Sequence, residues 1–453
     1  MRLRYVAITV ALGIVVLGME KPITSRSETA TKANEWGTAP SDSLITVVFR
    51  AQSTQVVRTD SGFVKRYIGD VVMRMNPDVW VTANQAVYDG IRREARLIGD
   101  VVAVDSGRTL RADRIDYLFE DHREAHGRPL ARLRQNVSIV DSTRRISTYA
   151  ADYWTEDDSV VAFGIVRVSL PGGTLDSDRL VYSAKIGDMS ASGKVKLYDS
   201  TQGITIRSEQ YQWFQRDSVA FVSGRPLLTK GEGDTMVFVE ADFMRYDQRS
   251  NQAVAWDSVR IDRGGLSAYC DSVVYDSGQE QLTLYGSPQA IQRTSGDTAT
   301  TISETTGERI VLQLDGSDVR EIRIFGTRAH PARAIATEFD RSRTKAGERW
   351  ITGDEVVFHT RDDRVERLEI FGQARSRNAP APSARTSEGI NEASGDTMVI
   401  TFEDNRIRKV FLRGGVEGLF RPPVDSSAVD TTVTSEILAP NEQGDGTMVD
   451  DGN

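Results

Sequence analysis

One spacing recurs along most of this chain and restricts what it can fold into: an aromatic residue is followed by a glycine eleven positions later. Tyr182 and Gly193 show the pattern most clearly, with Ser177 and Asp178 just before the tyrosine. The further copies are Tyr88 with Gly99, Tyr153 with Gly164, Trp213 with Gly224, Tyr275 with Gly286, and Tyr246 with Asp257 in place of the glycine. Successive units lie about 30 residues apart, which predicts a series of structurally similar units.

Within each unit the hydrophobic residues alternate with polar ones. Ile115 and Tyr117 lie two positions apart, as do Val195 and Leu197, with Lys196 between the latter pair. This period predicts antiparallel strands with one buried and one solvated face. Asp-Gly and Asp-Ser-Gly turns separate the strands, and the repeat glycine lies inside a strand, where glycine usually marks a bend. We therefore predict an all-β fold of repeated antiparallel strands, folded over on itself.

Composition divides the chain into five expected segments. Residues 1–20 combine Arg2 and Arg4 with an apolar run, which predicts a signal peptide or an N-terminal anchor. The other segments are a flexible lead-in at 21–43, the repeats at 44–294, a second β segment with longer loops at 295–421, and a disordered tail at 422–453. The boundary near 295 rests on a longer spacing, fourteen residues, in Leu312–Gly326, Phe358–Gly372 and Ile400–Gly414.

Several classes of function are disfavoured by composition and motifs. The formal net charge of −9 argues against a nucleic-acid partner, which would need a basic surface. No nucleotide-binding or hydrolase motif occurs in its required context, so we expect no catalysis and no cofactor. The 4 histidines are scattered, and the only cysteine, Cys270, takes a position that alanine or serine fills in other units. We expect no metal site and a structural role for Cys270.

Two residue types recur among the units. An aspartate follows the small residue of the motif, at Asp113, Asp178, Asp242 and Asp271. We interpret it as structural, either capping a turn or lying on the solvated face, because repetition from unit to unit is untypical of a catalytic residue. The tyrosines fit packing in a sheet interior somewhat better than stacking on a ligand, and both interpretations stay open.

The motif of a small residue, Asp, and Tyr, then a turn and a strand that contains Gly-x-Val, resembles the OstA-like (organic solvent tolerance) family. That family includes the lipopolysaccharide-transport proteins LptA and LptC and the N-terminal domain of LptD. The motif is carried here by Ala112-Asp113 with Tyr117, by Ser177-Asp178 with Tyr182 and Gly193-Lys194-Val195, and by Ala241-Asp242 with Tyr246. The resemblance covers roughly residues 45–420, and its specificity comes from the number of copies.

The resemblance implies an elongated, twisted, V-shaped β-jellyroll, with two or three units in series, whose dry interior holds lipid acyl chains. It implies a periplasmic protein, anchored in the inner membrane or associated with the outer membrane, that moves lipopolysaccharide or a similar glycolipid. Partners would be other Lpt-type proteins, joined end to end through edge strands, and an ATPase as the energy source. The residues expected to line the lipid groove are Val71, Met73, Tyr88, Val101, Tyr117, Val166, Val168, Tyr182, Val195, Leu197, Tyr246, Val259, Ile261 and Tyr275.

A structural envelope scaffold is the alternative: the same repeats would close over a side-chain-filled core, and only edges and loops would bind partners. A filled core should alternate large and small inward residues. The inward positions are mostly Val, Ile, Leu and Tyr, which does not decide between a groove and a filled core. An enzyme is a distant third interpretation that would need two carboxylates facing one cleft.

Overall fold

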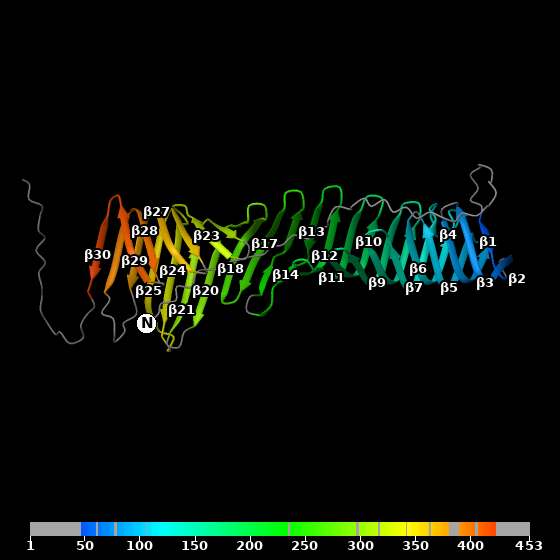
Figure 1. Cartoon of the computed structure of the whole chain (residues 1–453), viewed down its shortest axis with the longest axis horizontal. Coiled ribbons are helices and arrows are strands. Elements are labelled where there is room, and N and C mark those ends of the chain that lie inside the picture. The colour runs from blue at the N-terminus through cyan, green and yellow to red at the C-terminus, as the bar shows by residue number, and fades with distance from the viewer. Residues whose placement is uncertain are drawn as a thin grey trace, which may run out of the picture.

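The computed structural model describes residues 47–422, apart from 60–61, 77–78, 106, 234–235, 296–298, 316–317, 341, 362–363, 380–388 and 404–405. In this part of the chain, 30 strands form one antiparallel sheet and no helix occurs. Figure 1 shows an elongated body in which the strands follow one another from β1 and β2 at the blue end to β30 at the orange end. The prediction of an all-β fold with repeated antiparallel strands is confirmed.

The strands are long in the first half of the chain, and most are shorter in the second, where β27 with 16 residues and β28 with 14 are exceptions. Between β3 and β12 they contain 10 to 15 residues each. The bounds are β1 (Val48–Arg50), β2 (Ser53–Thr59), β3 (Gly62–Asn76), β4 (Val79–Asp89), β5 (Glu94–Asp105), β6 (Arg108–Leu118), β7 (Leu130–Val140), β8 (Arg145–Trp154), β9 (Ser159–Leu170), β10 (Gly173–Ser183), β11 (Asp188–Asp199), β12 (Ile204–Phe214), β13 (Val219–Ser223), β14 (Leu227–Lys230) and β15 (Val237–Glu240). They continue with β16 (Phe243–Asp247), β17 (Gln252–Arg263), β18 (Leu266–Asp276), β19 (Gln281–Tyr285), β20 (Gln289–Ser295), β21 (Thr300–Thr306), β22 (Arg309–Asp315), β23 (Asp318–Phe325), β24 (Ala332–Phe339), β25 (Lys345–Gly353), β26 (Glu355–Arg361), β27 (Arg364–Ala379), β28 (Ile390–Glu403), β29 (Arg406–Arg413) and β30 (Glu417–Arg421).

Long strands bend near their middle, and the repeat glycine is the first residue of the bend. In β11, Gly193 and Lys194 have φ angles of 76° and 48°. They drop out of the pairing with β12, which shifts register between Ser192 and Val195. Glycine adopts this left-handed backbone without strain, and a Cβ on Gly193 would lie only 2.8 Å from Oδ2 of Asp178 on β10. The eleven-residue spacing is therefore the length of chain from one hairpin to the next bend.

The bend predicts a specific sensitivity to a single methyl group. We expect Gly193→Ala to lower the free energy of unfolding by about 1–2 kcal/mol, because alanine is strained at this φ and its Cβ displaces Asp178. Gly418→Ala is the matched control, since nothing lies within 4 Å of a Cβ there and its φ is not left-handed. Hydrogen exchange of the amides of β10–β12 and of β30 measures both effects. Equal losses in the two variants would contradict this role of Gly193.

The bends fold the sheet into two layers that face each other. Layer A holds the strand halves that meet at hairpins 90–93, 155–158 and 184–187, and layer B holds the halves that meet at 141–144 and 200–203. Beyond β12, two short strands often replace one bent strand; β13 and β14, for example, both pair with β12. Among the short strands, layer A contains β2, β13, β16, β19, β22, β23, β26 and β29, and layer B contains β1, β14, β15, β20, β21, β24, β25 and β30.

The longer spacing after residue 295 has a local cause. Tyr182 pairs with Met189 across its hairpin, whereas Leu312 pairs with Ile322, so the later hairpin is three residues longer. The sheet itself continues through this region, because β20 pairs with both β18 and β21. The division into segments 44–294 and 295–421 stays a prediction. The expected segments 1–20 and 21–43, and the tail beyond residue 422, lie outside the described residues.

One hydrophobic core runs between the layers, from Val71 to Ile400. The alternation within each strand builds it. In β11, Val195 and Leu197 are buried while Lys194 and Lys196 are exposed. The apolar face of each strand thus points into the space between the layers, and the whole is the elongated, folded-over β-jellyroll expected from the sequence.

Candidate functional site

All fourteen residues expected to line a groove lie on the inner faces of the two layers and contribute to the one core. The two layers differ in chemistry. The nine aliphatic residues come from layer B and the five tyrosines from layer A: Val71, Met73, Val101, Val166, Val168, Val195, Leu197, Val259 and Ile261 face Tyr88, Tyr117, Tyr182, Tyr246 and Tyr275.

These side chains fill the interior. Of the fourteen residues only Tyr88 and Tyr275 are half-buried; the others are buried. The described conformation is one in which the aliphatic and aromatic faces pack against each other. A lipid chain reaching Leu197 or Val259 would therefore have to separate the layers. Contact of these residues with lipid stays a prediction.

An aromatic cluster joins the two layers at the β1 end. The ring of Phe49 on β1, in layer B, stacks on Tyr67 of layer A with centroids 4.4 Å apart, and it lies 5.6 Å from Tyr88. Phe119 continues the cluster with edge contacts to Tyr88 and Tyr117 at 6.0 and 5.0 Å. Offset and edge-on ring pairs are favourable beyond the area they bury. This end of the interior is closed by aromatic packing.

Next to this cluster, a polar seam joins the free margins of the two layers, which are the margins opposite the bends. The seam is formed by Asp105, Arg108, Asp141, Arg144, Tyr153, Asp158 and Tyr182. Arg108 of layer B forms an ion pair with Asp158 of layer A. The hydroxyl of Tyr153 lies 3.0 Å from Oδ1 of Asp158 and 3.1 Å from Oδ2 of Asp105. Contacts between hairpins of opposite layers thus close the mouth of the jellyroll here, opposite the bends.

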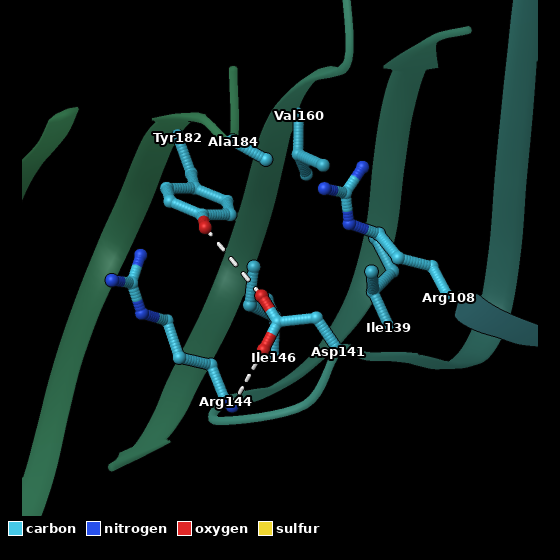
Figure 2. A pocket seen from close by; sticks show the side chains of 8 residues that line it. All are labelled: Arg108, Ile139, Asp141, Arg144, Ile146, Val160, Tyr182 and Ala184. Carbon is cyan, nitrogen blue, oxygen red and sulfur yellow. Dashed lines mark hydrogen bonds between the residues drawn. The ribbon is translucent and has the colours of Figure 1, made fainter. Parts of the chain in front are cut away.

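The seam encloses a small cavity beside Tyr182 (Figure 2). The Tyr182 hydroxyl donates to Oδ2 of Asp141 at 3.5 Å, and the guanidinium carbon of Arg144 lies 4.9 Å from the ring centre of Tyr182. Nη1 of Arg144 and Nε of Arg108 are buried without a hydrogen-bond partner. The cavity volume of about 10 Å³ is close to what one water needs. The site therefore suits a bridging water rather than an organic ligand.

The seam was not predicted from the sequence, although the sequence contains a signal for it. Asp105-Ser106-Gly107-Arg108 and Asp141-Ser142-Thr143-Arg144 share the pattern Asp-Ser-x-Arg in consecutive layer-B hairpins. In the second copy, Oδ1 of Asp141 accepts the backbone N–H groups of Thr143 and Arg144 at 2.8 and 2.7 Å. The aspartate shapes the turn and the arginine extends toward layer A, which explains why the two residues recur together.

The recurring aspartates lie over the bends, as a structural role requires. In glycine–aspartate pairs such as Gly193 with Asp178 and Gly286 with Asp271, the carboxylate covers the glycine of the next strand. The preceding small residue is buried, and where it is Ser177 its hydroxyl donates to the carbonyl of Arg179 at 3.1 Å, a carbonyl next to the register shift. Such local side-chain bonds compensate for ladder bonds lost at a bulge.

Cys270 takes the same small, buried position, and burial raises the pKa of its thiol to about 12. A thiol held neutral in this way is a poor nucleophile, which fits a structural role. Burial likewise raises the pKa of Tyr246 to about 12, with Asp247 contributing. It also raises the pKa values of Tyr153 and Tyr211.

These shifts predict a loss of stability in alkali. A pKa that is higher in the folded than in the unfolded chain means that the protonated group favours folding; this contribution is complete below the unfolded pKa and disappears as the pH rises to the folded pKa. For Cys270 the interval runs from 9.0 to about 12, and for Tyr246 from 10.0 to about 12. We expect the urea concentration at the midpoint of unfolding to fall as the pH rises through these intervals. Cys270→Ala should reduce this fall from pH 9 upward. A midpoint that does not change between pH 9 and 12 would contradict the prediction.

Both ends of the sheet leave strand edges without a partner in the described part of the chain. β1 and β2 pair only with β3, and β29 and β30 pair only with β28. Apolar side chains are uncovered at each end, including Val56, 65% exposed, and Phe420, 63% exposed. An exposed edge next to uncovered apolar residues is a template for pairing with another strand.

Other chemistry is sparse in the described residues. They contain no group of three or more His, Cys, Asp or Glu side chains that could hold a metal ion. His359 lies between two carboxylates, 3.5 Å from Glu321 and 3.1 Å from Glu369, on the outer face of layer A. Within the same described ranges, no helix is long and apolar enough to cross a membrane.

Similarity to known proteins is found at the level of solved structures. No protein-family model matches the chain, and no curated protein matches it either. Among solved structures, it is similar to the crystal structure of LptH from Pseudomonas aeruginosa, described as the LptA-homologous periplasmic component of the lipopolysaccharide transport device. The identity is 14%, the match covers 33% of this chain and 82% of that chain, and the TM-score is 0.16.

Proposed function

We propose that this protein is an exported, non-enzymatic carrier of lipopolysaccharide or a similar glycolipid, holding the acyl chains between its two layers. The observation that carries the proposal is the continuous apolar interior, which runs the length of an elongated sheet whose two ends are both unpaired within the described residues. A carrier in the periplasm needs such a dry path and needs ends that can join other proteins. The proposed function involves no catalytic step, cofactor or metal.

Entry of an acyl chain into a filled interior requires the layers to separate at their free margins. Packing against the lipid would then replace the packing of one layer on the other, because an acyl chain buried between the layers gains about 25 cal/mol for each Å² removed from water. The polar seam at Arg108 and Asp158 opposes this opening near β6–β9. We therefore propose that lipid moves through the part of the interior between β11 and β28.

The partners in this proposal are other β-jellyroll proteins, joined through edge strands. Charge favours a different protein over a second copy at these ends. In layer A, the edge strand β29 carries Arg408, Lys409 and Arg413, and the edge strand β2 at the other end carries Arg58 and no acidic residue; in layer B, β30 carries Glu417 and Arg421. Pairing β2 of one copy with β29 of another would bring like charges together, which is unfavourable.

Binding of lipopolysaccharide to the purified full chain tests the proposal. We expect binding of intact lipopolysaccharide, and no binding of the same molecule after its acyl chains are removed. Equal binding of both forms would indicate recognition of the sugars alone, and absence of binding to either would rule out the carrier function.

A structural scaffold is the second candidate, and one observation favours it. The inward side chains already fill the interior, with Tyr153, Tyr211 and Leu175 among the most completely buried residues. If the layers never separate, the protein would act only through its edges and loops.

A further inference from the structure

The inner face of layer B changes character along the molecule. Residues that pair laterally from strand to strand form rows across the inner face of layer B. One such row begins with large aliphatic side chains, including Leu197, Ile206, Leu228 and Ile261. From β18 onward the same row consists mainly of small residues. Its later members are Ala268, Ala290, Thr305, Ala334, Ile351, Ser376 and Ala393.

The next row toward the free margin of layer B is largely polar over these same strands. Gln292 pairs laterally with Ser303, and the row continues through Ala336, Arg349 and Asn378. Laterally paired residues point to the same face of a sheet, and residues two apart share that face. Since Thr305 is 2% exposed and packs inward, Ser303 and Gln292 point inward as well.

Layer A stays apolar opposite this region. Its inward residues Ile324, Val356, Ile370 and Met398 are fully buried. The strands of layer B, by contrast, are half-buried on both faces along most of β21 and β24. Their inner face is thus less completely covered than that of β9 or β11, and the interior between β20 and β28 has one apolar side and one polar margin.

The charge in this polar margin is balanced. Arg349 forms an ion pair with Glu338 at 3.4 Å, and both side chains are more than four-fifths buried. The remaining polar members of the row are amides and hydroxyls. Oε1 of Gln292 is buried without a hydrogen-bond partner. A buried acceptor without a donor is costly, so this atom would gain from a hydrogen bond donated by an incoming hydroxyl or amide group.

We propose that the interior between β20 and β28 binds the uncharged, hydroxyl-bearing head group of an amphiphile, with Gln292, Ser303 and Asn378 as hydrogen-bonding partners at successive points along the polar row. The acyl chains lie deeper, against layer A. The balanced Arg349–Glu338 pair makes this a site for sugar hydroxyls rather than for an anion. The inference rests on the proposed carrier function, because it assumes that acyl chains enter between the layers.

Two detergents with the same alkyl chain test the inference on the full chain. Dodecyl β-maltoside carries a sugar head group, and dodecyldimethylamine oxide carries no hydroxyl. Below their micelle-forming concentrations, we expect the maltoside to bind about tenfold more tightly, as for a site built to satisfy buried hydrogen-bonding groups. Isothermal titration calorimetry measures both affinities.

The double variant Gln292→Leu/Asn378→Leu should remove most of the preference and leave binding of the amine oxide unchanged. Thr337→Leu on β24 is the matched control, because Thr337 pairs with Ile302 on the opposite face and should not affect either affinity. If both detergents bind equally to the wild-type protein, this inference fails and the carrier function stands. If neither binds, both fail.

Discussion

Leu197→Asp is expected to lower the free energy of unfolding by at least about 3 kcal/mol, because it places an unpaired carboxylate in a dry interior. Leu197 is 2% exposed and pairs laterally with Leu175 and Ile206. All three residues point between the layers, so no water reaches the new charge unless the layers separate. Urea unfolding measures the loss. Hydrogen exchange should show that it spreads over β10–β12 rather than over the whole array, since repeats couple mainly to their neighbours.

Lys196→Asp provides the control for this substitution at the adjacent position. Lys196 is exposed on the outer face of β11 and pairs laterally with Asp176, so its replacement by aspartate should lower the free energy of unfolding by no more than about 1 kcal/mol. A similarly small effect of Leu197→Asp would mean that the interior at β11 is hydrated. That outcome would contradict the continuous dry path on which the carrier function depends.

Arg108→Met is expected to destabilise the mouth of the jellyroll by about 2 kcal/mol and to expose the hairpins at 105–108 and 155–158 to hydrogen exchange. The side chains of Arg108 and Asp158 are only 15% and 24% exposed, so removal of the arginine leaves a poorly solvated carboxylate. The Tyr153 hydroxyl, which lies 3.0 Å from Asp158, also loses the donor Nη1 of Arg108, 3.5 Å away. Amphiphile should enter the interior faster once this closure is lost.

Two further variants distinguish the effect of breaking the seam from the effect of losing any surface charge. Asp158→Asn in the Arg108→Met background should restore much of the stability, because both charges are then absent and asparagine tolerates the φ of 54° at this position. Arg167→Met should cost no more than about 0.5 kcal/mol, since the Arg167 side chain, paired with Asp176, is 63% exposed. An effect of Arg167→Met as large as that of Arg108→Met would contradict a special role for the seam.

The fold could be predicted because its determinants are local and repeated. The alternation around Val195 and Leu197 specifies which face is buried, and the left-handed bend at Gly193 requires a glycine or a comparably tolerant residue. Each unit repeats these two requirements, so the copies reinforce one another. The inward positions of the fourteen candidate residues followed from the same alternation.

The contacts between the layers could not be predicted in the same way. Arg108 and Asp158 are far apart in the chain, and their meeting depends on how far the two layers close over the core. The inward polar row could not be predicted from the sequence for a similar reason. Gln292, Ser303 and Asn378 come from separate strands, and only their lateral pairing places them in line.

Whether lipid passes through the interior is tested most directly by photocrosslinking to lipopolysaccharide in a Gram-negative envelope. A photoreactive residue is placed at Leu197 or Val259, which are buried and inward, and at Lys196 or Arg260, which are exposed on the outer face. The carrier function predicts adducts at Leu197 and Val259 and none at the two control positions. No adduct at any position, in a protein that is folded and exported, would contradict it and favour the structural scaffold.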